Sequence, residues 1–335
     1  MASRESFTAG IGSAETVIHL AGQNRGSESE VYETNLELAH LLVQALDSLG
    51  TAPALLFANS THSLGQSAFG RSKREASTIF GEWANHRKTR FVDVILPHVF
   101  GEGGRPFYNS GFATFCHQLA HGDEPEIITN GELQLIHAQR VARQFLELAG
   151  NARAEGVYRA KGTPMRVSEA LDRLKTIHRT YQDGLLPSLA DPLQLEFFNT
   201  YRSYLFPDYY PVQLDVRADP RGELLEAVKT RNGGQAFLST TRPGMTRGRH
   251  YHWQKFERFL VIAGEAEIRV RRLFEDHVKV FKVSGNEPGF IDIPTFHSHE
   301  ITNTGDRDLL TLFWSHEIYN ASNPDTYPEP VILEP

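Results

Sequence analysis

The last third of the chain contains the stretch that restricts the fold most, residues 244–264. It carries His250 and His252, and because side chains alternate along a β-strand, two histidines at this spacing point to the same face. Glu257 follows five residues after the second histidine and can return to that face at the end of the strand. The spacing therefore predicts a strand that presents polar, metal-ligating side chains to an interior.

A second segment, residues 294–303, indicates another short strand and carries His299. Together with His250, His252 and Glu257 it supplies three imidazoles and one carboxylate. Nitrogen and oxygen ligands of this kind suit zinc, iron, nickel or manganese. We therefore expect zinc, or another divalent metal, as a cofactor at this site.

The two segments resemble the two motifs of the cupin family, a small β-barrel of jelly-roll type. The first motif is matched at every position, by Gly244, His250, His252, Glu257 and Gly264. The second is matched by Pro294, His299 and Asn303. The resemblance implies that the three histidines and the glutamate are metal ligands. Phe296 replaces the usual glycine of the second motif, which favours the alternative of a metal-free cupin whose ligand positions became ordinary pocket residues.

Length and composition describe an ordinary globular protein of two domains, since 335 residues are too many for one small barrel. A net charge of -7 argues against nucleic acid as a partner. The single cysteine, Cys116, fits a reducing cytoplasm, and the first residues lack the features of a signal peptide. No apolar run approaches the ~20 residues that span a membrane. We therefore expect a cytoplasmic protein with no membrane partner.

The first half of the chain alternates between strand and helix patterns. Short apolar runs that indicate buried parallel strands are found at residues 14–22, 53–58 and 90–96. Helical spacing is found between them, at residues 33–50 and 72–86. Strands that alternate with helices in this way predict a Rossmann-like α/β domain with a doubly wound parallel sheet. We assign residues 1–205 to this domain.

This domain resembles the extended short-chain dehydrogenase/reductase family, which includes NAD-dependent epimerases and dehydratases that act on nucleotide sugars. The positions that match its cofactor-binding motifs are His19, Ala21, Gly22, Lys73 and Pro97. The positions that match its substrate loop are Tyr108, Asn109 and Ser110. Ser60 and Lys73 match the catalytic hydroxyl and the catalytic lysine. The resemblance implies NADPH as the second cofactor.

Two departures from that family bear on the reductase chemistry. Phe69 stands where the family has the tyrosine that delivers a proton to the carbonyl oxygen, and a phenyl ring has no proton to give. Only Gly10 and Gly12 precede the first strand, in place of a strand, a glycine-rich loop and a helix that bind the dinucleotide. We therefore expect a domain without its first strand and glycine-rich loop, and an impaired reductase. Ser60 and Tyr108 are the alternative proton donors.

The last part of the chain, residues 206–335, consists of short runs of alternating polar and apolar residues. Their spacing predicts an antiparallel β-barrel, in agreement with the cupin motifs. A dehydrogenase-like domain followed by a metal cupin resembles, nearly end to end, the CapF family of capsular polysaccharide-synthesis proteins. That resemblance implies a homodimer that acts on a UDP-2-acetamido-2,6-dideoxy-4-hexulose. The cupin would epimerise C3, and the first domain would reduce the C4 ketone with NADPH.

Epimerisation also needs a base and an acid. His297 lies two residues before His299 and should face the same interior, and Lys255 lies inside the first metal motif. We expect these two residues to exchange the C3 proton. The alternatives are a histidine that orients a metal ligand and a surface lysine.

Three functions remain open at this point. The first is a metal-dependent sugar-nucleotide epimerase with an impaired reductase half. The second is a full bifunctional enzyme whose start has been mis-called and in which an unusual donor replaces Phe69. The third is a non-catalytic protein that binds sugar nucleotides or serves as a scaffold.

Overall fold

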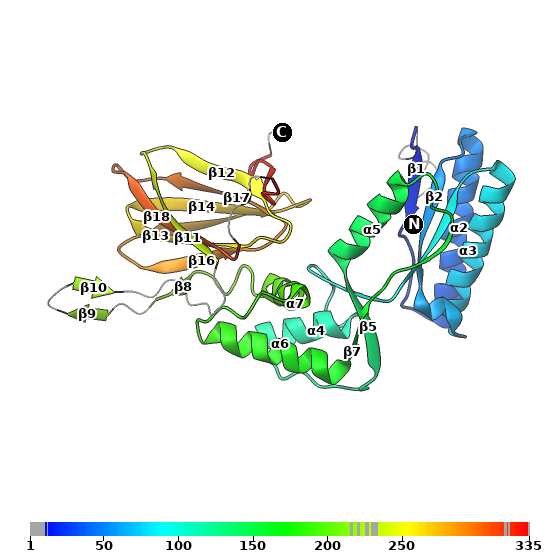
Figure 1. Ribbon diagram of the computed structural model, residues 1–335, viewed down its shortest axis with the longest axis horizontal. Coiled ribbons are helices and arrows are strands. Elements are labelled where there is room, and N and C mark those ends of the chain that lie inside the picture. The colour runs from blue at the N-terminus through cyan, green and yellow to red at the C-terminus, as the bar shows by residue number, and fades with distance from the viewer. Residues whose placement is uncertain are drawn as a thin grey trace. The chain divides into compact units, whose positions relative to one another are not determined.

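The computed structural model describes residues 11, 13–214, 217–219, 222–224, 228, 234–317, 320 and 322–333. Gly10 and Gly12 lie outside the described residues. The chain forms two compact units (Figure 1). The first comprises Met1–Gly101, Arg105–Gly111 and Ile127–Ala170, and the second comprises Glu102–Gly104, Phe112–Glu126 and Leu171–Pro335.

The first unit is built on a four-stranded parallel sheet in the order β1-β2-β3-β6. Its strands are β1 (Thr16–His19), β2 (Ala54–Ser60), β3 (Phe91–Leu96) and β6 (Gly156–Arg159). The helices of this unit are α2 (Glu28–Leu49), α3 (Ala68–Arg87) and α5 (Ala138–Gly150), with a 3-10 turn, η1 (Thr61–Leu64). A three-stranded sheet lies beside them, in the order β4 (His98–Phe100), β5 (Glu132–His137) and β7 (Thr163–Arg166).

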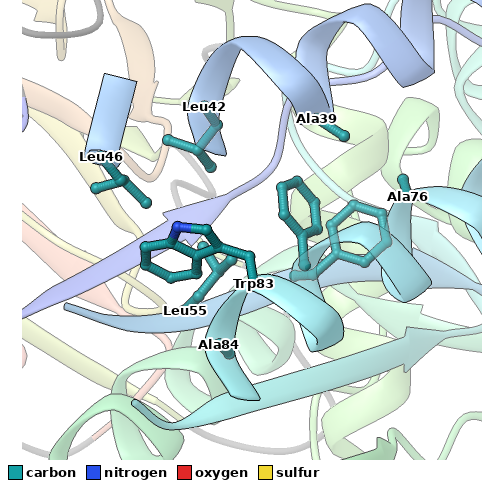
Figure 2. Packing of buried hydrophobic residues seen from close by; sticks show 9 residues of the cluster. Ala39, Leu42, Leu46, Leu55, Ala76, Trp83 and Ala84 are labelled. Atoms are coloured by element: carbon teal, nitrogen blue, oxygen red, sulfur yellow. The ribbon is translucent and has the colours of Figure 1, made fainter. Parts of the chain in front are cut away.

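Helices pack on both faces of the parallel sheet. Side chains alternate along β2, so that each face presents apolar residues to a helix. Leu55 and Phe57 point to one face and pack with residues of α2 and α3, where Figure 2 shows the Trp83 indole among leucine side chains. Leu56 and Ala58 point to the other face and pack with α5. The doubly wound arrangement expected from the sequence is therefore confirmed, with a separate apolar core on each side of the sheet.

Local signals fix the ends of α2. Ser27 caps its first turn and forms a capping box with Glu30, in which each side chain accepts a hydrogen bond from the other residue's backbone N–H. Gly50 ends the helix in the left-handed region, at φ 65°. The loop after β1 is joined to this helix through Asn35, whose side chain accepts from the N–H of Gln23 and donates to its carbonyl oxygen.

The second unit contains two five-stranded antiparallel sheets and a small hairpin. One sheet has the order β11-β18-β13-β16-β8 and the other the order β15-β14-β17-β12-β19. The first sheet consists of β8 (Val212–Gln213), β11 (Gln235–Thr241), β13 (Glu257–Ala263), β16 (Gly289–Ile293) and β18 (Leu309–Ser315). The second consists of β12 (Thr246–Tyr251), β14 (Glu265–Arg272), β15 (Val278–Ser284), β17 (His297–Asn303) and β19 (Tyr327–Pro328). The hairpin is formed by β9 (Arg217–Asp219) and β10 (Gly222–Leu224).

Helices α4 (Gly111–Ala120) and α6 (Val167–Gln182), for most of their length, and α7 (Pro192–Ser203) belong to this second unit. The Arg202 guanidinium is buried and donates to the carbonyl oxygen of Ile293 at 3.1 Å. The Phe198 ring lies 5.4 Å from that of Phe256, and the Tyr181 hydroxyl donates to the carboxylate of Asp292. Because these contacts join α6 and α7 to the β-sheets, the boundary expected near residue 206 lies inside the second unit.

Among the residues described here, no helix combines the length and the apolar character needed to cross a membrane.

Candidate metal centre and reductase site

Pairing between β12 and β17 brings the first two metal-ligand candidates together. His250 lies directly opposite His299 in the antiparallel register, and the register shifts between Gly248 and His250. Gly248 has φ 104°, and a Cβ there would lie 2.6 Å from the carbonyl oxygen of His299. Only glycine fits so close an approach, so the bulge that aims His250 inward depends on this residue.

The four predicted ligands form one compact group. Nitrogen atoms of His250, His252 and His299 and a carboxylate oxygen of Glu257 all lie within 4.8 Å of one another. His252, Glu257 and His299 are buried, whereas His250 is half-buried. The structure therefore brings together all four residues that the two sequence motifs single out, and exposes the group to solvent on the His250 side.

Two of the imidazoles have a ring nitrogen without a hydrogen-bond partner. Nδ1 of His252 lies 2.6 Å from the carbonyl oxygen of Asp325, and Nδ1 of His299 lies 3.2 Å from that of His297. A carbonyl oxygen only accepts, so each Nδ1 carries the proton and each neutral ring keeps a lone pair on Nε2. Both Nε2 atoms are buried without a hydrogen-bond partner.

These two lone pairs face a carboxylate. The Nε2 atoms of His252 and His299 lie 3.2 Å and 3.6 Å from Oε2 of Glu257. Lone pairs that converge on a carboxylate oxygen repel one another unless a cation or a proton lies between them. The donor set and its second hydrogen bonds to carbonyls fit a divalent metal ion.

Charge at the site also favours a cation. Burial, followed by the neighbouring imidazoles of His299 and His252, lowers the pKa of His250 to about 3, so this imidazole is neutral at physiological pH. Burial alone would raise the pKa of Glu257, but the neighbouring imidazoles of His252 and His299 hold it well below its ordinary value. The group thus offers a neutral imidazole and an ionised carboxylate to a metal.

Asp325 organises the loop that follows His252, a role that the sequence analysis did not identify. Its carboxylate accepts hydrogen bonds from the backbone N–H groups of Trp253, Gln254 and Lys255, at 3.0, 2.8 and 2.6 Å. Its carbonyl oxygen orients the His252 ring. These contacts join segments about seventy residues apart, so no local spacing in the sequence encodes them.

Phe296 keeps the backbone of the glycine that it replaces. Its φ is 59°, in the left-handed region, and its N–H donates to the carbonyl oxygen of His252 at 3.0 Å. The ring of Phe296 packs 5.7 Å from that of Trp253. The substitution that favoured a metal-free reading therefore leaves the turn beside His252 hydrogen-bonded.

The two candidates for proton exchange are both buried, so the alternative of a surface lysine is wrong. Lys255 donates from Nζ to the carbonyl oxygen of Pro324 at 3.1 Å and to Oγ1 of Thr326 at 3.0 Å. Nδ1 of His297 lies 2.8 Å from the carbonyl oxygen of Thr295. Burial lowers the pKa of His297 to about 4, so this imidazole is neutral and can accept a proton at Nε2.

In the first unit, the predicted cofactor-binding residues gather at the end of β1. His19 is buried, and Ala21 and Gly22 follow it in an exposed loop. A Cβ on Gly22 would lie 3.4 Å from Nζ of Lys73, so the loop passes close to the lysine. Asn35 Nδ2 donates to the carbonyl oxygen of Gln23, and this ties the loop to α2.

Lys73 extends from α3 toward the sheet. Its Nζ donates to the carbonyl oxygen of Ala58 at 2.8 Å and lies 4.4 Å from the centre of the Phe57 ring. Burial lowers its pKa to about 8, although Asp93 acts in the opposite direction. The Phe69 ring lies one turn earlier on α3, 6.0 Å from the same Nζ, in the place of the family's tyrosine.

The other predicted residues of this unit line neighbouring segments. Ser60 ends β2, and its Oγ accepts a hydrogen bond from the N–H of His62 at 3.2 Å. Pro97 is buried between β3 and β4. The predicted substrate-binding residues lie on one loop and are Tyr108, Asn109 and Ser110. This loop is tied to the loop after β1.

Arg25, which the sequence analysis did not identify, makes that connection. Its Nε donates to Oδ1 of Asn109 at 2.7 Å, and its guanidinium lies 5.5 Å from the centre of the Tyr108 ring. Arg105 contacts the same ring at 5.1 Å. Tyr108, one of the alternative proton donors, is therefore in contact with two guanidinium groups.

Two parts of the chain match known protein families. Residues 2–160 match the NAD dependent epimerase/dehydratase family, and residues 217–327 match the polysaccharide biosynthesis C-terminal domain. The UDP-2-acetamido-2,6-beta-L-arabino-hexul-4-ose reductase of Pseudomonas aeruginosa is 31% identical over 322 residues, which cover 95% of this chain and 86% of that protein. The class is that of sugar-nucleotide epimerases and reductases of polysaccharide biosynthesis.

Solved structures narrow the class to one family. The crystal structure of the capsular polysaccharide assembling protein CapF from Staphylococcus aureus is 27% identical, with a TM-score of 0.58, and the match covers 98% of this chain and 90% of that one. The chain belongs to the CapF-like family. UDP-glucose 4-epimerase from Thermotoga maritima, 16% identical with a TM-score of 0.52, covers 60% of this chain and 81% of its own, and shares the fold alone.

Proposed function

We propose that the protein is a metal-dependent sugar-nucleotide epimerase that inverts C3 of a UDP-2-acetamido-2,6-dideoxy-4-hexulose. The proposal is supported above all by the two buried, unpartnered Nε2 atoms of His252 and His299, which converge with His250 on Glu257. Zinc suits this set of ligands best. In this proposal residues 206–335, which belong to the second unit, form a cupin domain, and the two antiparallel sheets are compatible with that fold.

The chemistry follows from the position of the ketone in the substrate. A C3 hydrogen next to a C4 carbonyl is acidic because its carbanion delocalises into an enolate. A bound metal ion supplies Lewis acidity toward the carbonyl oxygen. The chain itself must remove the proton from one face of the sugar and return a proton to the other face.

His297 and Lys255 are the groups that we assign to these two transfers. Burial keeps the His297 imidazole neutral, as a base must be. Lys255 carries protons on Nζ and is held by Pro324 and Thr326, so its direction is fixed. A neutral base and a protonated lysine match the two roles, removal and return of the proton.

We assign NADPH-dependent reduction of the C4 ketone to the first unit, and we propose that this half is impaired. Lys73 and the loop residues Ala21 and Gly22 would hold the cofactor, as the resemblance to the dehydrogenase family implies. Phe69 cannot donate the proton that a tyrosine donates, so reduction must run without a phenol at this position. We further propose that the protein works as a homodimer.

Solvent exchange at C3 tests the epimerase directly. In deuterium oxide without NADPH, the metal-loaded protein is expected to exchange the C3 hydrogen of the 4-hexulose, as followed by NMR. His299→Ala should abolish this exchange, whereas His277→Ala, which changes an exposed histidine of the same unit, should not. No exchange by the fully metal-loaded protein would exclude the enzyme and leave a protein that only binds sugar nucleotides.

A further inference from the structure

The turn between β2 and α3 places an imidazole beside the phenyl ring that replaces the family's tyrosine. This turn is η1, and it carries His62, two residues after Ser60. The centre of the His62 ring lies 6.2 Å from that of Phe69, with the two rings nearly edge to face. His62 is exposed, so its ring is in contact with solvent on one side.

Packing against α3 fixes the backbone of this turn. A Cβ on Gly70 would lie 2.2 Å from the carbonyl oxygen of His62, so the first turn of α3 touches that carbonyl directly. The N–H of Gly65 donates to the same oxygen at 2.9 Å, and Nη1 of Arg74 donates to the carbonyl oxygen of Ser63 at 2.6 Å. The Ser60 hydroxyl accepts the N–H of His62. The backbone of His62 is thus fixed next to Phe69 by its hydrogen bonds with Gly65 and Ser60 and by its close approach to Gly70.

We propose that His62 is the proton donor of the reductase half and takes the role that the phenol plays in related enzymes. This inference rests on the proposed reduction of a UDP-4-hexulose by NADPH. A lone imidazole can act as a general acid near neutral pH, whereas a phenyl ring cannot. The chain that lacks a donor at position 69 therefore carries one on the adjoining turn.

A second histidine favours this assignment. The His98 ring lies 5.9 Å from that of His62. Burial, and then the charge of His62, lower the pKa of His98, so the fold disfavours a protonated His98 beside the His62 ring.

Reduction of the ketone to an alcohol needs one hydride, from NADPH, and one proton, from His62. A hydride passes from C4 of the nicotinamide to the carbonyl carbon of the sugar, and the C–O double bond becomes a single bond. The imidazolium of His62 gives its proton to the carbonyl oxygen, so the products are an alcohol, NADP⁺ and a neutral imidazole. Because the His62 side chain is exposed, water can restore its proton before the next turnover.

A pair of substitutions on the full-length, metal-loaded protein tests this assignment. His62→Gln keeps a side chain of similar reach that cannot act as an acid, and the rate of NADPH oxidation with the 4-hexulose should fall on the order of a hundredfold or more. Phe69→Tyr introduced into that variant should restore the rate, because the phenol then supplies the proton. His86→Gln, at the far end of α3, is the matched control and should leave the rate unchanged.

Deuterium exchange at C3, measured on the same samples without NADPH, separates the two proposals. Exchange retained in His62→Gln shows that the second unit is folded, and rescue by Phe69→Tyr shows that the first unit is folded, so that a lost reduction reports on the donor alone. The assignment is overturned if His62→Gln oxidises NADPH at the parent rate, if Phe69→Tyr fails to rescue it, or if the parent protein exchanges C3 but never oxidises NADPH. Absence of both exchange and oxidation in the parent protein would instead contradict the proposed function itself.

Discussion

At the scale of single residues, buried imidazoles serve the two units in different ways. In the second unit, the lone pairs of His252 and His299 converge on a carboxylate and fit a metal. In the first unit, His19 packs its ring 5.7 Å from Phe57 and 5.1 Å from Phe80, among aromatic side chains. Burial lowers the pKa of His250 in the second unit and of His19 in the first, because it disfavours the charged form.

His19 should therefore make the first unit sensitive to acid. Burial, followed by the charge of Lys73, lowers its pKa from 6.5 to about 4. Between these two values the unfolded chain binds the proton and the folded chain does not, so stability is lost as the pH falls from about 6.5 toward 4 and is unaffected above that window. The loss contributed by this residue is up to about 3 kcal/mol.

The measurement is urea unfolding of the full chain at about pH 7 and about pH 5, for the parent protein and for His19→Phe. The phenyl ring keeps the aromatic packing and does not titrate, so the variant should lose less stability between the two pH values. Taking the difference between the two proteins cancels the contributions of all other titrating groups. Equal losses in both proteins would show that His19 is not kept neutral by the fold.

At the scale of elements, α3 carries two glycines whose surroundings differ. A Cβ on Gly70 would meet the carbonyl oxygen of His62 at 2.2 Å, which is too close for any real contact. A Cβ on Gly81 would meet the Phe91 ring at 3.6 Å, which is ordinary van der Waals contact. One glycine is thus required by packing, and the other only weakens the helix.

The two alanine substitutions should change stability in opposite directions. Gly70→Ala should destabilise the protein by about 1–3 kcal/mol, because the turn at η1 must move away from α3. Gly81→Ala should stabilise it by about 0.5–1 kcal/mol, because alanine loses less backbone entropy in a helix interior. Denaturant unfolding measures both changes, and a stabilising Gly70→Ala would mean that the turn is not packed as described.

Most of the secondary structure could be predicted from the sequence, but the helix starts could not be placed well. The helix expected at residues 33–50 begins at Glu28, because Ser27 and Glu30 form a capping box that the apolar spacing does not report. The helix expected at residues 72–86 begins at Ala68, where the Ser67 side chain caps the N–H of Gly70. In both cases the missed signal is a capping serine one residue before the helix, which the spacing of apolar residues does not reveal.

In the candidate sites, residues within a sequence motif could be predicted, whereas residues that act through contacts between separate segments could not. The four metal-ligand candidates follow from spacing, because two strand motifs encode them. Asp325 and His62 did not follow from spacing. Asp325 acts on a loop far away in the chain, and His62 becomes meaningful only once its ring is seen beside Phe69. Packing between elements carries that information, and a single sequence does not display it.

At the scale of the whole molecule, each compact unit has an apolar interior of its own. The first unit has separate clusters on the two faces of its parallel sheet. In the second unit the buried apolar residues include Phe259, Ile268 and Phe313, from strands of both antiparallel sheets. The metal-ligand candidates all belong to the second unit. Binding of a metal should therefore stabilise that unit in particular.

Removal of the metal by a chelator tests this expectation. A ligand that binds only the folded state stabilises it by about 2.7 kcal/mol when its free concentration is a hundred times Kd. Without the ion, lone pairs of His252 and His299 again face the carboxylate of Glu257, and β12, β13 and β17 should open more often. Hydrogen exchange followed by mass spectrometry should show faster exchange in these strands, and unchanged exchange in α2, α3 and β2. Reloading with zinc should restore the original rates, and His299→Ala should exchange at the fast rate with or without zinc. Equal acceleration in both units, or none after verified metal removal, would contradict a metal centre that supports the second unit alone.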